Sequence, residues 1–428
     1  MKRLSFLTSF LLLCLTVSQG LAQGESSSLV DRRGEDLSIA KTYTFETDRL
    51  AGSWQVQVSL PPSYEQTDDA YPVVYSLHGD FYFKFAVGGL QRLMEFGNMP
   101  EVIIVGISNE SNAYFAFGSE GADQFLDFME ADIFPFVEQN YRTHPDRTAM
   151  GWHYTSGFIF HALSRRPYLF QNYIPASPYL GGYDISLIDF QALVELAFVH
   201  PETKKHLYFG VLNNERTVTT AALSLDSLLR KKAPASLEWK FNPIEPDYEK
   251  FIEISVYRLW QAGLKTVYAA YRADQLEYKD LEDFESKGGL PAMKKHYVER
   301  AIEYGGTSKP PGLISLMRMA ERADDFSLFE DLMTIFGENF EGVNLNRVLG
   351  FAAFYLKHDK PEKAIRIYDR VNQFYPNSVT VHIALAEAYS TMNNSAKAKK
   401  AYKKAIVLAI AQGDERREAI EKKLAQLK

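Results

Sequence analysis

The sequence predicts an α/β domain, with a doubly wound and mostly parallel sheet, followed by an all-α domain of repeated helices. Two observations carry this prediction. Over residues 41–270, short runs of β-branched and aromatic residues alternate with segments of helical periodicity, the pattern of a parallel sheet covered by helices. After residue 270 these runs stop, and from about residue 346 several positions recur at a fixed interval.

The chain of 428 residues begins with a segment typical of export. A basic start precedes an apolar run over 4–17, and small residues follow as far as Ala22. This order predicts a signal peptide over 1–22, with an uncleaved membrane anchor as the alternative. The polar residues 23–40 are predicted to form a linker. We therefore expect an exported protein, periplasmic or extracellular, with no membrane span once the signal is removed.

Composition argues against several classes of function. The net charge is −7 and no long basic run occurs, so nucleic-acid binding is not expected, because affinity for phosphates needs clustered Lys and Arg. The single cysteine, Cys14, lies within the predicted signal peptide. A mature chain without a thiol has no disulfide, cysteine nucleophile or cysteine-based zinc site. No cofactor is predicted.

The elements of the α/β domain follow in order along residues 41–270. Alternation of apolar and polar residues indicates a half-buried strand, whereas wholly apolar runs indicate strands buried on both faces. Strands are predicted over residues 54–60, 71–77, 102–107 and 206–212, and helices over 122–137 and 157–163. The segment 148–151 leads into a turn before the second of these helices.

The all-α part is divided into a helical connector, 271–345, and a repeat domain, 346–428. Three positions recur in the repeat domain at one constant interval: Tyr355, Ala364 and Tyr368 return as Tyr389, Ala398 and Tyr402. A helix–turn–helix unit of about 34 residues is the tetratricopeptide signature, and the alanines mark places where two helices approach closely. Such units present a concave surface, so we expect a peptide or protein partner.

Several segments of the α/β domain together carry a family resemblance. They read LPPSY at 60–64, YPVVYSLHGD at 71–80, GSEGADQFL at 118–126, IFP at 133–135 and QNYRT at 139–143. This combination resembles the putative-esterase family of α/β-hydrolases, which includes enterochelin and ferric-siderophore esterases and S-formylglutathione hydrolase. The repeat domain is similar to an appendage found in a bacterial exported subgroup. The resemblance implies an α/β-hydrolase fold and a small ester or siderophore-like ligand.

The segment GWHYTSG at 151–157 aligns with the nucleophile elbow of such hydrolases, normally G-x-S-x-G. The resemblance places His153 at the position of the nucleophilic serine. Thr155 and Ser156 stand at two positions that are usually glycine, where side-chain room is scarce. Imidazole can attack acyl groups, but it is larger than a serine side chain and would project into the space for the substrate carbonyl.

The resemblance also implies positions for the acid and the base of a catalytic triad. Glu215 follows the strand predicted at 206–212, where the family often carries a carboxylate that orients a histidine. The histidine itself should follow within residues 242–251, but none occurs between His206 and His296. Because a serine without a base is a weak nucleophile near neutral pH, we expect a degenerate triad and a binding protein.

Two alternatives stay open. An active carboxylic-ester hydrolase would use a rearranged site, with His153 as base for Ser156 or Tyr154 and Glu215 as the orienting carboxylate. A metal site would combine His153 and Glu215 with His78, although these ligands have no diagnostic spacing.

Other residues have smaller predicted roles. The backbone amides of Gly79 and Asp80 would line an oxyanion hole, and Trp152 and Tyr154 would line the pocket. His161 lies within an apolar helix and is predicted to be a buried, hydrogen-bonded structural residue.

Overall fold

The computed structural model describes residues 38–77, 79–109, 111, 113–180, 188–200, 204–212, 216–244, 252–337, 340 and 343–427. The predicted signal peptide and nearly all of the predicted linker lie outside these residues. Within the described part of the chain, no helix is long and apolar enough to cross a membrane.

The described strands form one eight-stranded sheet in the order β1-β2-β4-β3-β5-β6-β7-β8. Their bounds are β1 Lys41–Thr47, β2 Leu50–Ser59, β3 Tyr71–Leu77, β4 Ile103–Ser108, β5 Thr143–Trp152, β6 Asn172–Ala176, β7 Lys205–Leu212 and β8 Leu237–Ile244. Strand β2 pairs antiparallel with β1 and β4, and the other neighbouring pairs are parallel. The sheet is therefore mostly parallel, as the sequence predicts.

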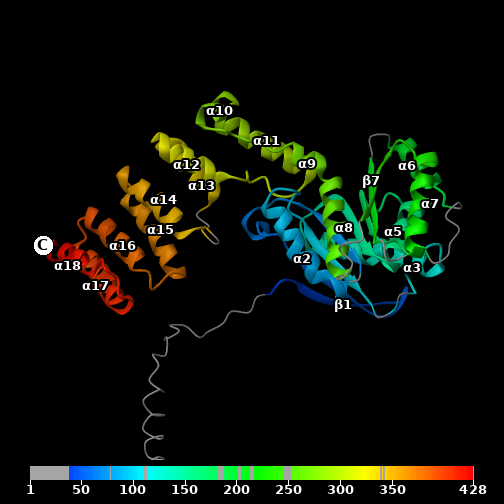
Figure 1. Cartoon of the computed structure of the whole chain (residues 1–428), viewed down its shortest axis with the longest axis horizontal. Coiled ribbons are helices and arrows are strands. Elements are labelled where there is room, and N and C mark those ends of the chain that lie inside the picture. The colour runs from blue at the N-terminus through cyan, green and yellow to red at the C-terminus, as the bar shows by residue number, and fades with distance from the viewer. Residues whose placement is uncertain are drawn as a thin grey trace, which may run out of the picture. The chain divides into compact units, whose positions relative to one another are not determined.

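Helices cover both faces of the sheet (Figure 1). One face is covered by α2 (Gly79–Glu95) and α8 (Ile252–Val267), which lie side by side. The other face is covered by α3 (Glu120–Phe128), α4 (Phe134–Asn140), α5 (Tyr154–Arg165) and α7 (Arg216–Lys232), with α6 (Gln191–Val199) against α5. Strand side chains alternate between the two cores, since Val73 and Tyr75 face the α5 side and Val74 faces the α8 side.

The helix predicted over 122–137 contains a π-helical turn. Helix α3 continues through η2 (Met129–Ile133) into α4, where Pro135 lies in the first turn. Because proline lacks an N–H and its ring clashes with the carbonyl four residues earlier, a regular α-helix does not pass through this point, and one extra residue is accommodated in the preceding turn.

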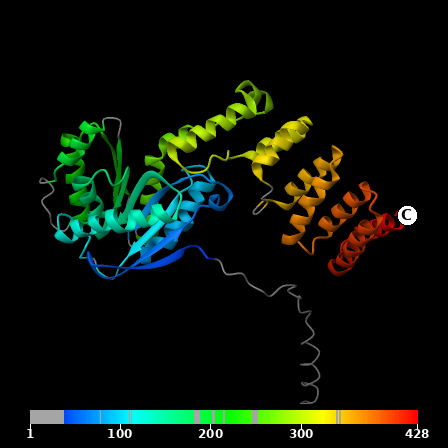
Figure 2. The same ribbon diagram turned by 180° about the vertical axis from the view of Figure 1, so that it is seen from behind.

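The remainder of the described chain is helical. It comprises α9 (Ala269–Ala273), α10 (Leu281–Ser286), α11 (Gly289–Tyr304), α12 (Leu313–Ala323), α13 (Phe326–Phe336), α14 (Leu345–Lys357), α15 (Pro361–Phe374), α16 (Val379–Thr391), α17 (Ser395–Gln412) and α18 (Arg417–Gln426). Figure 2 shows the helices from α14 onward, orange to red, as a succession of neighbouring helices, each packed on the next.

The interval that the sequence predicts is present in the structure. The spacing from the start of α14 to the start of α16 equals that from the start of α15 to the start of α17, and it matches the interval between the recurring tyrosines. The two turns also match, because Asp359 and Asn393 have φ of 56° and 55°. In each turn the next backbone N–H bonds a tyrosine carbonyl at 2.9 Å, that of Tyr355 or of Tyr389.

Candidate active site

The residue at the predicted nucleophile position lies at a sharp strand-to-helix turn. Strand β5 ends at Trp152 and α5 begins at Tyr154, so His153 lies between them with φ 54° and ψ −110°. A non-glycine residue adopts such angles only under constraint from its surroundings. The constraint is visible here: the His153 N–H donates to the Ala176 carbonyl at 3.1 Å, and its carbonyl accepts from Tyr179 at 3.1 Å.

The two hydroxyl residues after His153 are completely buried and bonded to backbone. Thr155 Oγ1 accepts from the Trp152 N–H and donates to the Trp152 carbonyl, both at 2.9 Å. Ser156 Oγ donates to the Ala176 carbonyl at 2.8 Å. A Cβ at Gly151 would lie 2.6 Å from Thr155 Oγ1, so the first elbow glycine is needed. These bonds make both hydroxyls part of the turn and direct Ser156 toward the sheet.

The His153 ring is surrounded by aromatic side chains. It stacks on Tyr179 with centroids 4.9 Å apart and meets the edge of Tyr154 at 4.6 Å. Trp152 is 5.4 Å away and in turn packs on Tyr82. The ring itself is half-buried, whereas Tyr154 is 38 % exposed. Such surroundings suit a ligand with an apolar or aromatic part, because ring faces and edges attract one another.

The edge of the sheet at which His153 lies is formed by the carboxyl ends of the parallel strands. The carboxyl ends of β3, β5, β6, β7 and β8 all lie at this edge. His78 follows β3, Glu215 follows β7 and residues 245–250 follow β8, but all of these lie outside the described residues. Gly79 and Asp80 form the start of α2, directly after β3. The Tyr154 N–H follows the nucleophile position, where hydrolases of this fold place one oxyanion donor.

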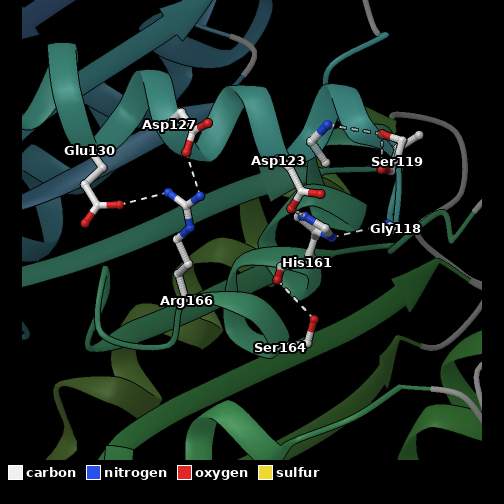
Figure 3. A network of polar contacts seen from close by, with 10 residues as sticks. Gly118, Ser119, Asp123, Asp127, Glu130, His161, Ser164 and Arg166 are labelled. Carbon is white, nitrogen blue, oxygen red and sulfur yellow. Dashed lines mark hydrogen bonds and ion pairs between the residues drawn. The ribbon is translucent and has the colours of Figure 1, made fainter.

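His161 is confirmed as a buried, hydrogen-bonded structural residue. Its side chain is 1 % exposed, Nδ1 accepts from the Gly118 N–H at 3.2 Å, and Nε2 faces Asp123 Oδ1 at 2.9 Å (Figure 3). Because Nδ1 accepts, the neutral ring carries its proton on Nε2. Burial lowers the pKa of His161, and Asp123 opposes this effect. With both ring nitrogens bonded, His161 has no free base for catalysis.

The same helices are joined by an ion-pair cluster. Arg166 contacts Asp127 at 2.5 Å and Glu130 at 2.8 Å (Figure 3). The Tyr168 hydroxyl also bonds Glu130. These pairs hold α3 and η2 against the end of α5, which begins at the elbow.

The structure adds residues that the sequence did not indicate. Ser177, directly after β6, has φ 43°, and its Oγ accepts from the Leu212 N–H at 3.1 Å. Trp260 of α8 donates from Nε1 to the Gly151 carbonyl at 3.0 Å. Tyr179 supplies the ring on which His153 stacks. Their roles depend on pairing between distant segments, so no local sequence signal marks them.

No group of three or more His, Cys, Asp or Glu residues able to hold a metal ion occurs among the described residues. The metal alternative depends on His78 and Glu215, which lie outside that part of the chain. It therefore stays a prediction.

The sheet order, the helices on both faces and the strand–turn–helix at His153 define an α/β-hydrolase fold. A family model described as Putative esterase matches residues 47–265, which is more than half of the chain. The chain therefore belongs to this esterase family.

Several solved structures are similar to this chain at low sequence identity. An IroE-like serine hydrolase from Shewanella oneidensis is 22 % identical with a TM-score of 0.50, over 69 % of this chain and 98 % of that one. An uncharacterised protein from Capnocytophaga ochracea DSM 7271 is 14 % identical with a TM-score of 0.48, over 91 % of this chain and 99 % of that one. The BES protein from Bacillus cereus is 21 % identical with a TM-score of 0.46, over 55 % and 98 %. No curated protein matches the chain.

Proposed function

We propose that this chain is an exported member of the esterase family with a degenerate catalytic site, and that it binds its ligand without cleaving it. The observation that carries the proposal is the elbow itself. His153 lies where the fold presents a serine, and the hydroxyl of Ser156 is buried and bonded to the Ala176 carbonyl. A hydroxyl in that position has no access to an ester, and its proton is already donated to the Ala176 carbonyl, so no base activates it.

The ligand we propose for the α/β part is a small ester or siderophore-like molecule with an aromatic or apolar portion. His153, Tyr154 and Tyr179 would contact that portion at the carboxyl edge of the sheet. For the C-terminal helices we propose tetratricopeptide-like units that bind a peptide or protein partner. Their constant helical interval and their fully buried Ala364 and Ala398 support this assignment.

An active carboxylic-ester hydrolase is the second candidate, and one observation favours it. His153 keeps the strained backbone of a nucleophile position, and the Tyr154 N–H follows it as an oxyanion donor. In this version His153 would act as base or nucleophile, with Tyr154 nearby and Glu215 as the carboxylate that orients the ring. The burial of Ser156 makes Tyr154 the better hydroxyl partner.

Hydrolysis of p-nitrophenyl acetate and butyrate by residues 23–428 tests the proposal. His153→Ala is measured beside the parent, and His200→Ala, an exposed histidine after α6, serves as the matched control. We expect no turnover above buffer in any of the three proteins. Turnover that is lost only in His153→Ala would establish the second candidate. Turnover that survives in both variants would also overturn the proposal, because a different catalytic group must then be present.

Export has its own test. The full chain is expressed in a Gram-negative bacterium, and the N-terminus of the protein in the periplasmic fraction is determined by mass spectrometry. We expect a mature chain that begins at Gln23. A chain retained in the cytoplasm with its first residues intact would contradict this part of the proposal.

A further inference from the structure

A cavity lies away from the elbow, near the amino ends of the parallel strands. Its volume is about 700 Å³, within the range of small-molecule sites. It is lined by Gln66 and Thr67 ahead of β3, by Lys294 and Val298 of α11, by residues 308–310, by residues 334–337 at the end of α13, and by Arg370 of α15. The helices that contribute are labelled in Figure 1. We call this cavity the basic cleft.

The described lining residues of the basic cleft carry charge of one sign. Lys294, Lys309 and Arg370 are cationic, and none of the described lining residues is Asp or Glu. Lys294 and Arg370 are exposed, and neither side chain forms an ion pair with another residue in the described part of the chain. In a chain with a net charge of −7, the three cations that line this cavity favour a local positive potential. A cleft concentrates such a potential and attracts anions.

Lys309 occupies the inner wall of the cleft. Its Nζ donates to the Phe336 carbonyl at 2.8 Å and lies 5.3 Å from the centre of the Phe336 ring. Burial lowers the pKa of Lys309, and the Coulombic attraction of Glu101 opposes that effect. Glu101 itself accepts from the Ser63 N–H at 3.1 Å. An ammonium held at a fixed place, with donor capacity left over, is suited to receive an oxyanion.

Part of the wall is apolar. Val298 is 50 % exposed, and Ile335, Phe336 and Pro310 also line the cavity. Exposed apolar surface beside fixed cations favours a ligand that has both an anionic head and an apolar body, because each part then meets a matching surface. A simple inorganic anion would leave the apolar wall unused.

Hydrogen bonds between the α/β part and the segment that leads into α12 hold the cleft in shape. The Gly306 N–H donates to the Ala70 carbonyl at 2.8 Å. Ser308 donates from its N–H and its Oγ to Asp69 Oδ2, at 3.0 and 3.1 Å. These bonds fix the segment that carries Lys309, so a ligand binds to a largely preformed site and loses little affinity to ordering it.

We propose that the basic cleft binds a small organic anion, one carboxylate or phosphate head on an apolar body. The cations would take the head, and Val298 and Phe336 would contact the body. The site is separate from the elbow, since Thr67 precedes β3 whereas His153 follows β5, and parallel strands place these positions at opposite edges of the sheet.

Isothermal titration calorimetry at low ionic strength tests the proposal on residues 23–428. The probes are octanoate, octyl phosphate, neutral 1-octanol and inorganic phosphate, so that head and body are varied separately. We expect octanoate or octyl phosphate to bind more tightly than either 1-octanol or inorganic phosphate. Added salt should weaken binding, because it screens the exposed cations.

Variants locate the binding. Lys294→Ala and Arg370→Ala remove exposed side chains and should each weaken the bound amphiphile about threefold to tenfold, the usual range for one charge-assisted contact. Lys400→Ala, an exposed lysine of α17, should have no effect, nor should His153→Ala at the elbow. Far-UV circular dichroism confirms that each variant is folded.

Four outcomes would overturn the proposal. The first is that neither amphiphile binds. The second and third are that 1-octanol binds as tightly as octanoate, or that inorganic phosphate binds as tightly as octyl phosphate. The fourth is that His153→Ala abolishes binding while Arg370→Ala leaves it intact. The last would place the amphiphile at the elbow.

Discussion

Asp146 and Lys205 lie near the amino ends of the parallel strands, and we expect Asp146 to make the stability of the protein depend on pH. Burial raises the pKa of Asp146 to about 7, while Lys205 and the amide of Asn172, 2.8 Å from Oδ1, lower it. Lys205 is almost inaccessible and donates to the Phe170 carbonyl at 2.7 Å, and burial lowers its pKa to about 8. Asp146→Asn keeps the shape and the hydrogen-bond acceptor but removes the titration.

The direction follows from the two states of Asp146. The folded pKa of about 7 lies above the unfolded value of 3.8, so folding favours the protonated carboxyl. The stability that this provides is complete below about pH 4, is lost as the pH rises toward 7, and stays lost above it. At about 1.4 kcal/mol per pKa unit the total is at most about 4 kcal/mol, and partial solvent access reduces it to about 2–4 kcal/mol.

Urea unfolding from about pH 5 to about pH 8 measures this loss. All four tryptophans, at positions 54, 152, 239 and 260, lie in the α/β part, so their fluorescence reports on that part. We expect the free energy of unfolding of Asp146→Asn, minus that of the parent, to increase by about 2 kcal/mol over this range. Asp68→Asn, an exposed control, should give a constant difference. A constant difference for Asp146→Asn would refute the reasoning.

Four further substitutions test the packing. A Cβ at Gly210 would lie 2.5 Å from the Asn242 carbonyl, so Gly210→Ala should lower the free energy of unfolding by about 1–3 kcal/mol. A Cβ at Gly88 would meet open space at an exposed helical position, so Gly88→Ala should raise the free energy of unfolding by about 0.5–1 kcal/mol. Both are measured by urea unfolding with tryptophan fluorescence, and equal effects would contradict the contact. His161→Ala should cost about 2–4 kcal/mol by the same measurement, because it leaves a cavity and removes two hydrogen bonds. A loss below about 1 kcal/mol would show that these contacts are not stabilising. Ala364→Leu should overpack the helix contact and lower the circular-dichroism transition of the C-terminal helices while the fluorescence transition stays in place; a shift of both would show that the two parts unfold together.

Three of the predicted strands come from mostly apolar runs, and the fourth, over residues 54–60, comes from alternation of apolar and polar residues. The fourth lies within β2 apart from residue 60, and β2 begins four residues earlier. Residues 71–77 form β3 as predicted, and β4 and β7 differ from the prediction by one residue at most at each end. The sequence pattern does not predict β6, because its five residues include Asn172 and Pro175, and proline weakens a strand signal. The sequence pattern does not predict β1 and β8 either, because they are the two outermost strands of the sheet, where exposed polar positions interrupt the apolar pattern.

At the elbow, the position of His153 could be predicted from the sequence, but the orientation of the side chains around it could not. The family resemblance of residues 151–157 predicts that His153 occupies the elbow, and the structure places it at the turn between β5 and α5. The direction of Ser156 and the stacking of Tyr179 both depend on β6, whose residue Ala176 pairs beside Trp152. Sequence reasoning that lacks this strand cannot orient the side chains that face it.

The matching turns at Asp359 and Asn393 have a consequence for how this chain can change over evolutionary time. Since the backbone leaves both turns with the same φ and the same closing hydrogen bond, an extra copy of residues 360–393 would enter and leave the array in register. Each added pair would contact only helices of the kind already present, with α18 still covering the end through Ile420. Duplication within the gene is therefore a conservative way to lengthen the helical array, and it leaves the hydrolase fold unchanged.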